Sequence, residues 1–258
     1  MNLAELWEYR ELLYFLVWRD LKVRYKQTVI GLAWAVIQPL FTMIVFSIFF
    51  GRLAGLPSDG VPYPIFYYTA LLPWTYFANA LTQASNAIVA HQQVITKVYF
   101  ARVLLPVSAV LSGLADFAVA SAILFAMMLG YGIVPTWNIL WLLPLLLLAI
   151  LTAMAVSLWL SALNALYRDV RYAVPFVLQF WMFASPVAYP ASLVPDHWRW
   201  LYGLNPMAGV IEGFRWAIAG AGPAPGPMLA ASSAVVLIVL VGGFFYFQWM
   251  ERTVADVV

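Results

Sequence analysis

Five long stretches of the sequence are almost free of charge, and they constrain the fold more than any other feature. They are the uncharged ranges 29–50, 61–90, 172–195 and 216–250, and the range 103–167, in which Asp116 is the one charged residue. A helix that crosses the hydrocarbon core of a bilayer needs about 20 predominantly apolar residues. Charged residues make up 9% of the chain, against about 25% in a typical soluble domain. The sequence therefore predicts a membrane protein.

We expect one all-α domain, residues 1–258, with six transmembrane helices. The range 103–167 is too long for one span, and the turn residues of "GYGIVPTWN" at 130–138 divide it. The fifth span is short and contains two prolines, which membrane helices tolerate when neighbours satisfy the freed carbonyl groups. Spans one to five occupy 29–190, and the six predicted spans are 29–51, 64–89, 104–130, 138–166, 172–190 and 227–250.

The distribution of Lys and Arg orients these spans. With six spans, both termini lie on the same side of the membrane. Ten of the 13 Lys and Arg fall on that side, whereas Arg52, Arg199 and Arg215 fall on the other. Cytoplasmic loops are enriched in Lys and Arg, so we expect both termini and the loops at 90–103 and 167–171 to be cytoplasmic. The net charge of +2 is too small to indicate a nucleic-acid partner.

A cluster of cations precedes the first span, within residues 1–28. The stretch "RDLKVRYKQTVIG" contains four of the 13 Lys and Arg: Arg19, Lys22, Arg24 and Lys26. The apolar run at 12–18 is too short to span, and polar and apolar side chains fall on roughly opposite helical faces. This pattern favours an amphipathic helix on the inner leaflet. The alternative is that the cations only mark the cytoplasmic edge of the first span.

Residues 191–226 form a different kind of segment on the outer side. It contains two short apolar pieces, 197–204 and 207–219, which are separated by Asn205-Pro206. Each piece is too short to span, so we expect re-entrant or interfacial half-helices. Glu212 and Arg215 are three residues apart on the second piece and are therefore placed to form an ion pair.

The sequence predicts no catalytic residue, no metal site and no cofactor in this chain. It contains no cysteine, which excludes thiolate chemistry, and it lacks the phosphate-binding motif G-x-x-x-x-G-K-[ST]. Its two histidines, His91 and His197, are assigned to opposite sides of the membrane and do not stand at metal-binding spacing.

Asp116 is the one acidic residue inside a predicted span. A charged Asp near the bilayer centre costs about 2.5–3.5 kcal/mol on insertion scales. Small residues surround it in "SAVLSGLADFAVASA", which is typical of a helix packed among others. In a functional interpretation, Asp116 is a polar partner in the bundle or lines the transport path. The alternative is a structural acid that is protonated or hydrogen-bonded.

Four segments resemble, in the same order, the ABC-2 type permeases that export polysaccharides such as O-antigen and teichoic acid. They are "RDLKVRYKQTVIGLAWAVIQPL" (19–40), "ITKVYFARVLLP" (95–106), "LYRDVRYAVPF" (166–176) and "YGLNPMAGVIEGFRWAI" (202–218). The resemblance implies a homodimer in the bacterial cytoplasmic membrane, joined to two copies of an ABC ATPase subunit that binds ATP and Mg²⁺. It also implies a channel at the dimer interface that carries a lipid-linked glycan outward among the membrane lipids.

Two other functions remain open at this point. A drug or lipid exporter of the same superfamily would have the same fold and a different cargo. A membrane-embedded transferase would need a cluster of acids and histidines at one membrane depth, which this sequence lacks.

The resemblance implies roles for particular residues. The N-terminal helix and the first cytoplasmic loop, with Lys97 and Arg102, contact the ATPase, and "YRDVR" is the second contact, with Arg168, Asp169 and Arg171. The segment 191–220 forms the outer gate, with Glu212 and Arg215. At the cytoplasmic mouth, the candidates to hold an anionic lipid head group are Arg19, Lys22, Arg24 and Lys26.

An aromatic cluster, "YPIFYYTALLPWTYF", occupies residues 63–77. Tyr63, Tyr67 and Trp74 share one helical face, at spacings of four and seven, and Tyr76 lies off it. Aromatic faces pack well on the C–H surfaces of sugars, so we expect some of these side chains to line the substrate path. The alternative is an interfacial belt that faces lipid.

Overall fold

The computed structural model describes residues 9–26, 33–95, 100–220 and 222–254. Within these ranges the chain is helical and contains no strand, which confirms the all-α prediction. The longer helices are α2 (Arg10–Lys26), α3 (Ala33–Phe46, extended by η1, Ser47–Leu53), α4 (Tyr63–Ala90), α6 (Leu104–Gly130), α7 (Leu142–Leu166), α8 (Val170–Ala184), α10 (Pro206–Ala219) and α11 (Gly226–Val254). The short ones are α5 (Gln92–Ile95), η2 (Trp137–Trp141), η3 (Ala191–Leu193) and α9 (Asp196–Tyr202).

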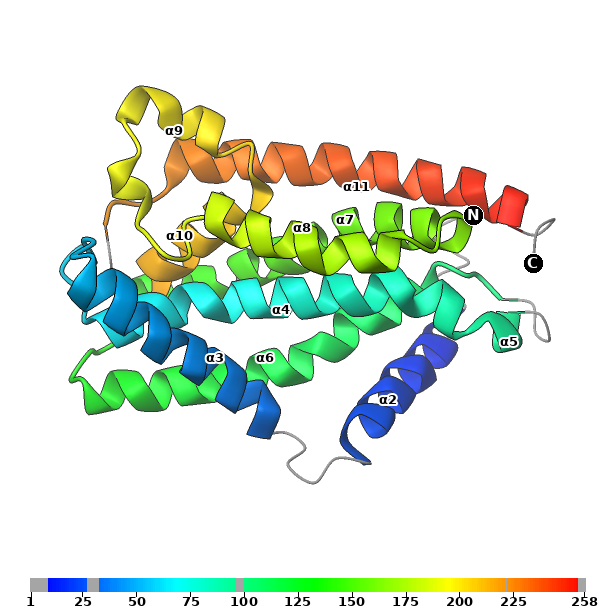
Figure 1. The fold of residues 1–258 in the computed structure, drawn as a ribbon, viewed down its shortest axis with the longest axis horizontal. Coiled ribbons are helices and arrows are strands. Elements are labelled where there is room, and N and C mark those ends of the chain that lie inside the picture. The colour runs from blue at the N-terminus through cyan, green and yellow to red at the C-terminus, as the bar shows by residue number, and fades with distance from the viewer. Residues whose placement is uncertain (1–8, 27–32, 96–99, 221, 255–258) are drawn as a thin grey trace.

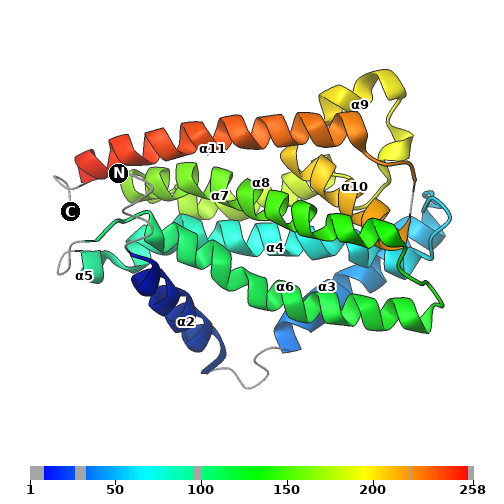
Figure 2. The same ribbon diagram turned by 180° about the vertical axis from the view of Figure 1, so that it is seen from behind.

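The long helices run lengthwise, so the molecule has two ends (Figure 1). The end that carries α5 also holds the beginning of α8 and the last residues of α11; we call it the α5 end. The opposite, α9 end holds α9, the connection from η1 to α4 and the connection from α6 to η2 (Figure 2). The loops predicted to be cytoplasmic therefore gather at the α5 end, and those predicted to be outside gather at the α9 end.

Helix α4 forms the centre of the bundle. It contacts α3, α6, α7, α8 and α10, and its side chains Phe66, Tyr67 and Phe77 are fully buried. Pro62 is the N-cap residue of α4 and Pro64 lies in its first turn, where a proline loses no helical hydrogen bond. Since other helices surround α4, its sequence can include polar side chains that a lipid-facing helix could not.

Four helices are long and apolar enough to cross a membrane: Ala33–Leu53, Leu104–Gly130, Trp137–Leu166 and Gly226–Glu251. They correspond to predicted spans one, three, four and six. Predicted span two is α4, which has 28 residues but is more polar. Predicted span five is α8, and its predicted boundary at residue 190 is wrong, because the helix ends at Ala184. Ser185 is extended, as a residue before proline prefers to be.

The predicted division of the outer segment at Asn205-Pro206 is confirmed, since α9 precedes it and α10 follows it. The Asn205 side chain accepts a hydrogen bond from the Met207 backbone N–H and another from Trp181 of α8. Helix α10 then packs closely on α11, because a Cβ atom at Gly209 would lie 2.6 Å from Ser232 Oγ. Glycine at this position thus lets the two helices approach.

Candidate functional site: a polar cleft beside α2

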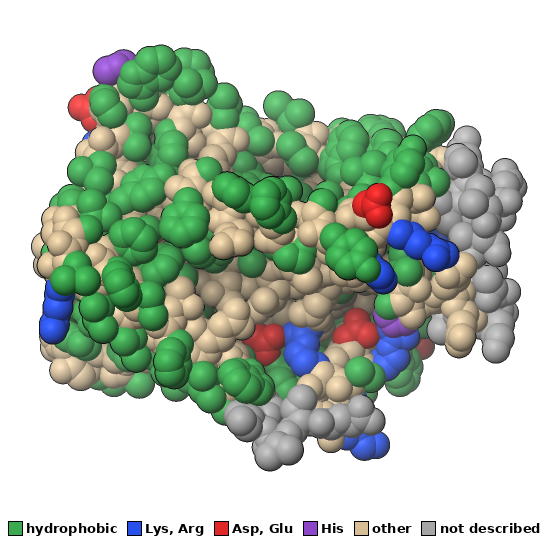
Figure 3. Space-filling model, viewed as in Figure 1, with side chains coloured by type: hydrophobic (Ala, Val, Ile, Leu, Met, Phe, Trp, Pro, Cys, Tyr) green, Lys and Arg blue, Asp and Glu red, His purple; other side chains and the backbone are tan. Residues whose placement is uncertain are grey.

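A cleft of about 750 Å³ lies between α2, α3, α4 and α6. Figure 3 shows acidic, basic and histidine side chains in a hollow on a face that is otherwise mostly hydrophobic. The charged and histidine side chains that line the cleft are Arg19, Asp20, Arg24, His91 and Asp116. Such a cleft is unusual in a chain with so few charges, which makes it the first candidate for a functional site.

Arg24 connects α2 to the centre of the bundle. Its Nη1 atom lies 2.5 Å from Asp116 Oδ2, and its Nη2 atom donates to Ser112 Oγ at 3.0 Å and to Gln83. The Tyr25 hydroxyl donates to the other oxygen of Asp116, and burial and this bond raise the pKa of Tyr25 to about 12. The structure therefore places Asp116 as a polar partner within the bundle, paired with a cation 92 residues away in sequence.

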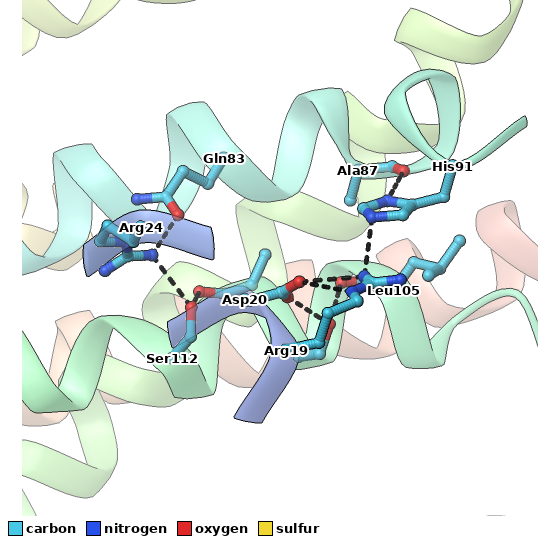
Figure 4. A network of polar contacts seen from close by, with 10 residues as sticks. Arg19, Asp20, Arg24, Gln83, Ala87, His91, Leu105 and Ser112 are labelled. Atoms are coloured by element: carbon cyan, nitrogen blue, oxygen red, sulfur yellow. Dashed lines mark hydrogen bonds and ion pairs between the residues drawn. The ribbon is translucent and has the colours of Figure 1, made fainter. Parts of the chain in front are cut away.

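A second polar group lies one turn earlier on α2 (Figure 4). Arg19 Nη2 lies 2.9 Å from Asp20 Oδ1 and 2.7 Å from His91 Nε2. Asp20 Oδ2 accepts from Ser108 of α6 at 3.1 Å. His91 Nδ1 lies 2.8 Å from the Ala87 carbonyl oxygen, so Nδ1 carries the proton and Nε2 accepts from Arg19. Both groups thus connect α2 to α4 and α6.

The charges of the cleft balance. Arg19 pairs with Asp20 and Arg24 pairs with Asp116. The side chains of the second pair are 21% and 20% exposed, so water screens them only in part. Removal of one partner would leave the other charge uncompensated in a poorly solvated place. The cleft consequently orients α2 through paired charges and does not present a free positive charge to an anion.

Uncharged polar side chains of α4 extend the cleft. Asn79, Thr82, Gln83 and Asn86 line it, and a narrow extension of about 30 Å³ continues along α4 to Thr75. This row was not predicted from the sequence, because its members carry no charge and lie within an otherwise apolar predicted span. The signal was the recurrence of polar residues every three or four positions in "TYFANALTQASN", which places them on one helical face.

The four cations of α2 that were predicted to hold a lipid head group divide into two pairs. Arg19 and Arg24 turn toward α4 and α6, whereas Lys22 and Lys26 are exposed. The Lys22 ammonium lies 5.3 Å from the Trp18 ring centroid, a favourable cation–π distance. The polar side chains of α2 therefore do not all lie on one exposed helical face. Lys22 and Lys26 remain the candidates for a lipid head group.

The aromatic side chains predicted to line the substrate path belong to the core of the chain. Tyr67, Trp74 and Tyr76 are 0%, 5% and 4% exposed, and Tyr63 stacks on Tyr67 with centroids 6.3 Å apart. The alternative of a lipid-facing belt is wrong for the three buried residues. A contact with substrate would require this packing to open, so the path role of these residues stays a prediction.

The residues predicted to contact an ATPase lie at the α5 end. Arg168 and Asp169 are exposed on the connection between α7 and α8, and Arg171 is exposed in the first turn of α8. Arg102 is partly buried, and its backbone N–H donates to Glu251 of α11 at 3.2 Å. Lys97 lies outside the described residues.

The predicted ion pair of the outer segment is present. Arg215 Nη1 lies 2.7 Å from Glu212 Oε1, and the Arg215 side chain is 1% exposed. Its guanidinium also donates to the carbonyl oxygens of Val187 and Tyr189 and lies 3.8 Å from the Phe66 ring centroid. These contacts hold the connection after α8 against α10 and α4.

An all-helical bundle with four apolar helices of spanning length around a polar cleft defines a multi-pass membrane protein. The chain belongs to the ABC-2 type transporter family, whose model matches residues 11–219. It is thus the membrane subunit of a transporter, in agreement with the predicted family.

Comparison with characterised proteins identifies several relatives. An O-antigen export system permease protein RfbA from Myxococcus xanthus is 33% identical over 82% of this chain and 81% of its own length. An RfbA protein from Klebsiella pneumoniae is 30% identical over 80% of this chain and 79% of its own length. The polysialic acid transport protein KpsM from Escherichia coli is 21% identical over 91% of each chain.

Proposed function

We propose that this chain is the permease subunit of an ATP-driven ABC exporter that moves a lipid-linked, O-antigen-like polysaccharide out across the bacterial cytoplasmic membrane. The observation that carries the proposal is the identity of 33% and 30% to two O-antigen export permeases over most of the chain. The similarity to a polysialic acid transport protein along 91% of the chain agrees with a polysaccharide cargo.

The proposed assembly contains two copies of this chain and two copies of an ABC ATPase subunit. α3, α4, α6, α7, α8 and α11 would be the six spans, with both termini in the cytoplasm and a channel for the glycan between the two permease subunits. The excess of Lys and Arg in the segments at the α5 end supports this orientation. ATP and Mg²⁺ belong to the ATPase subunit, and this chain supplies no cofactor.

In this proposal the polar contacts of the cleft transmit movement from the ATPase to the helix bundle. The ATPase contacts the α5 end, where Arg168 and Arg171 are exposed. If the ATPase also displaces α2, this movement acts directly on α4 and α6, because Arg24 of α2 contacts Asp116 and Ser112 of α6 and Gln83 of α4. Ion pairs suit this role, because a shift of α2 would separate charges that have few other partners nearby, so α4 and α6 would tend to move with α2.

Reconstitution tests the proposed function. Proteoliposomes that contain the permease, its ATPase partner and a lipid-linked glycan receive ATP on the ATPase side. We expect the glycan to become accessible to a glycan-degrading enzyme on the opposite side, and an ATPase with a disabled phosphate-binding motif to abolish this change. Transport of a drug or a short lipid, together with failure to move the glycan, would favour an ABC-2 drug or lipid exporter instead.

A further inference from the structure

A second pocket, of about 380 Å³, lies at the α9 end, far from the polar cleft. This volume falls in the range of about 300–1,000 Å³ that is usual for small-molecule sites. Five separate segments form it: the loop before α4, the segment before α9 that contains η3, α9 itself, α10, and the Pro-rich connection that leads into α11. The side chains that supply its chemistry are Asp59, Ser192, Asp196, Arg199, Trp200 and Glu212.

Polar contacts fix two walls of this pocket. Ser192 Oγ donates to Asp59 Oδ1 at 2.9 Å, so the loop before α4 is joined to the loop before α9. The Ala191 backbone N–H donates to Glu212 Oε1 at 3.1 Å, and the same oxygen accepts from the buried Arg215. One wall of the pocket is therefore anchored by the most deeply buried ion pair of the described residues.

The lining combines an aromatic platform with hydrogen-bonding groups. The Trp200 indole is exposed, and the Pro and Gly residues of the 222–228 connection supply a C–H-rich wall. Asp59 and Asp196 offer acceptors, and Arg199 offers donors, one of which contacts the Val194 carbonyl oxygen. A sugar ring presents a C–H face and a rim of hydroxyl groups, and this lining matches both.

The charges of the pocket select among sugars. Three acids, Asp59, Asp196 and Glu212, and one cation, Arg199, line the pocket, and Arg215 pairs with Glu212 outside the lining. These five groups together carry one negative charge. Arg199 pairs with Asp196 and Arg215 pairs with Glu212, whereas Asp59 has no ion-pair partner in the described part of the chain. A carboxylated sugar would be repelled by Asp59. A divalent cation is a poor alternative, because no three acids or histidines of the described ranges converge on a metal position.

We propose that this pocket binds uncharged sugar units of the exported glycan at the outer end of the permease. The inference rests on the proposed function, because the α9 end is the side at which the glycan would emerge. It adds a sugar-binding site outside the membrane core and a preference for neutral over acidic sugars.

Equilibrium binding to the purified permease in lipid nanodiscs tests the inference without ATP or ATPase. The probes are neutral tetrasaccharides of glucose, galactose and mannose, and tetragalacturonate as the acidic probe. We expect at least one neutral probe to bind and tetragalacturonate to bind at least tenfold more weakly. Trp200→Ala should weaken the neutral binding at least tenfold. Trp198→Ala is the matched control, because Trp198 is similarly exposed on α9 but does not line the pocket.

Asp59→Asn separates charge from shape. This variant keeps an acceptor for Ser192 and removes the acid that has no ion-pair partner among the described residues, so we expect neutral binding to persist and tetragalacturonate binding to rise toward it. The inference is overturned if no neutral probe binds, if both Trp variants bind equally well, or if the acidic probe binds the unaltered protein as tightly as the neutral ones. Glycan export by the reconstituted transporter, measured separately, would then still support the proposed function.

Discussion

Arg24 and Asp116 form an ion pair between α2 and α6 whose side chains are about four-fifths buried. The pair contributes less to stability than the attraction between its charges, because burial removes both charges from water. Loss of one partner leaves a charge with poor solvation, whereas loss of both removes the problem together with the bond. The interaction energy between the two side chains is therefore the informative quantity, and single substitutions do not measure it.

A double-mutant cycle should show this coupling. Asp116→Asn and Arg24→Gln should each lower the free energy of unfolding by about 1–3 kcal/mol, discounted from the 3–5 kcal/mol of a fully buried pair because water reaches part of these side chains. The double variant should lose less than the sum of the two, by about 0.5–3 kcal/mol. The measurement is denaturant unfolding in detergent micelles. Strictly additive losses would show that the two side chains do not interact.

Tyr67 permits a test of the path role that the sequence predicted. Its hydroxyl is buried without a hydrogen-bond partner among the described residues, so Tyr67→Phe should leave stability unchanged or raise it by up to about 1 kcal/mol. Tyr76→Phe is the matched control, since it removes a bond from the Tyr76 hydroxyl to the Val110 carbonyl oxygen and should be destabilising. Thermal unfolding measures both.

Export per folded molecule then decides what the Tyr67 hydroxyl does. Unchanged export by Tyr67→Phe would mean that this hydroxyl makes no necessary contact with the glycan. Phe66→Ala is unsuitable as a control, because Phe66 is fully buried and its ring lies against the Arg215 guanidinium.

These residues show what sequence could and could not predict. Glu212 and Arg215 were predictable as a pair because they are three residues apart on one helix. The partner of Asp116 was not, because 92 residues separate it from Arg24 and only the packing of α2 on α6 brings them together. Local spacing constrains neighbours on one helix, whereas contacts between helices require the fold.

At the scale of elements, the connection between α7 and α8 is the best-exposed candidate for ATPase contact. Arg168→Glu/Arg171→Glu should reduce co-purification of the ATPase subunit at least tenfold, because two exposed cations, one before α8 and one in its first turn, become anions. Arg52→Glu is the control, since Arg52 is also exposed but lies near the α9 end. Normal co-purification of the double variant in correctly inserted protein would contradict the predicted contact.

Helix α4 explains why hydropathy alone gives an incomplete list of spans. Five neighbouring helices surround it, so its Asn and Gln side chains meet α2, α3 and the cleft rather than lipid. The helices at the periphery of the bundle were recognisable as spans from hydropathy, because side chains that face lipid must be apolar. A central helix is free of that constraint, and its polar row carries the feature most relevant to function.

At the scale of the whole molecule, the two ends of the bundle predict a topology. Reporter domains fused after Gly60, Pro135 and Pro223 should report the outside, because these positions belong to connections at the α9 end. Fusions after Gln93 and Asp169, at the α5 end, should report the cytoplasm. A cytoplasmic signal after Pro223 would contradict six spans with both termini inside.

The length of α8 affects the membrane around the protein. Its 15 residues extend about 22 Å at 1.5 Å per residue, whereas the hydrocarbon core of a bilayer is about 30 Å thick. Under the six-span topology, the shortfall of about 8 Å is met by the extended chain that follows α8 or by compression of the lipid beside it. In the second case the bilayer is thinner beside α8 than elsewhere, and a polar cargo that crosses there meets the thinnest part of the hydrocarbon barrier.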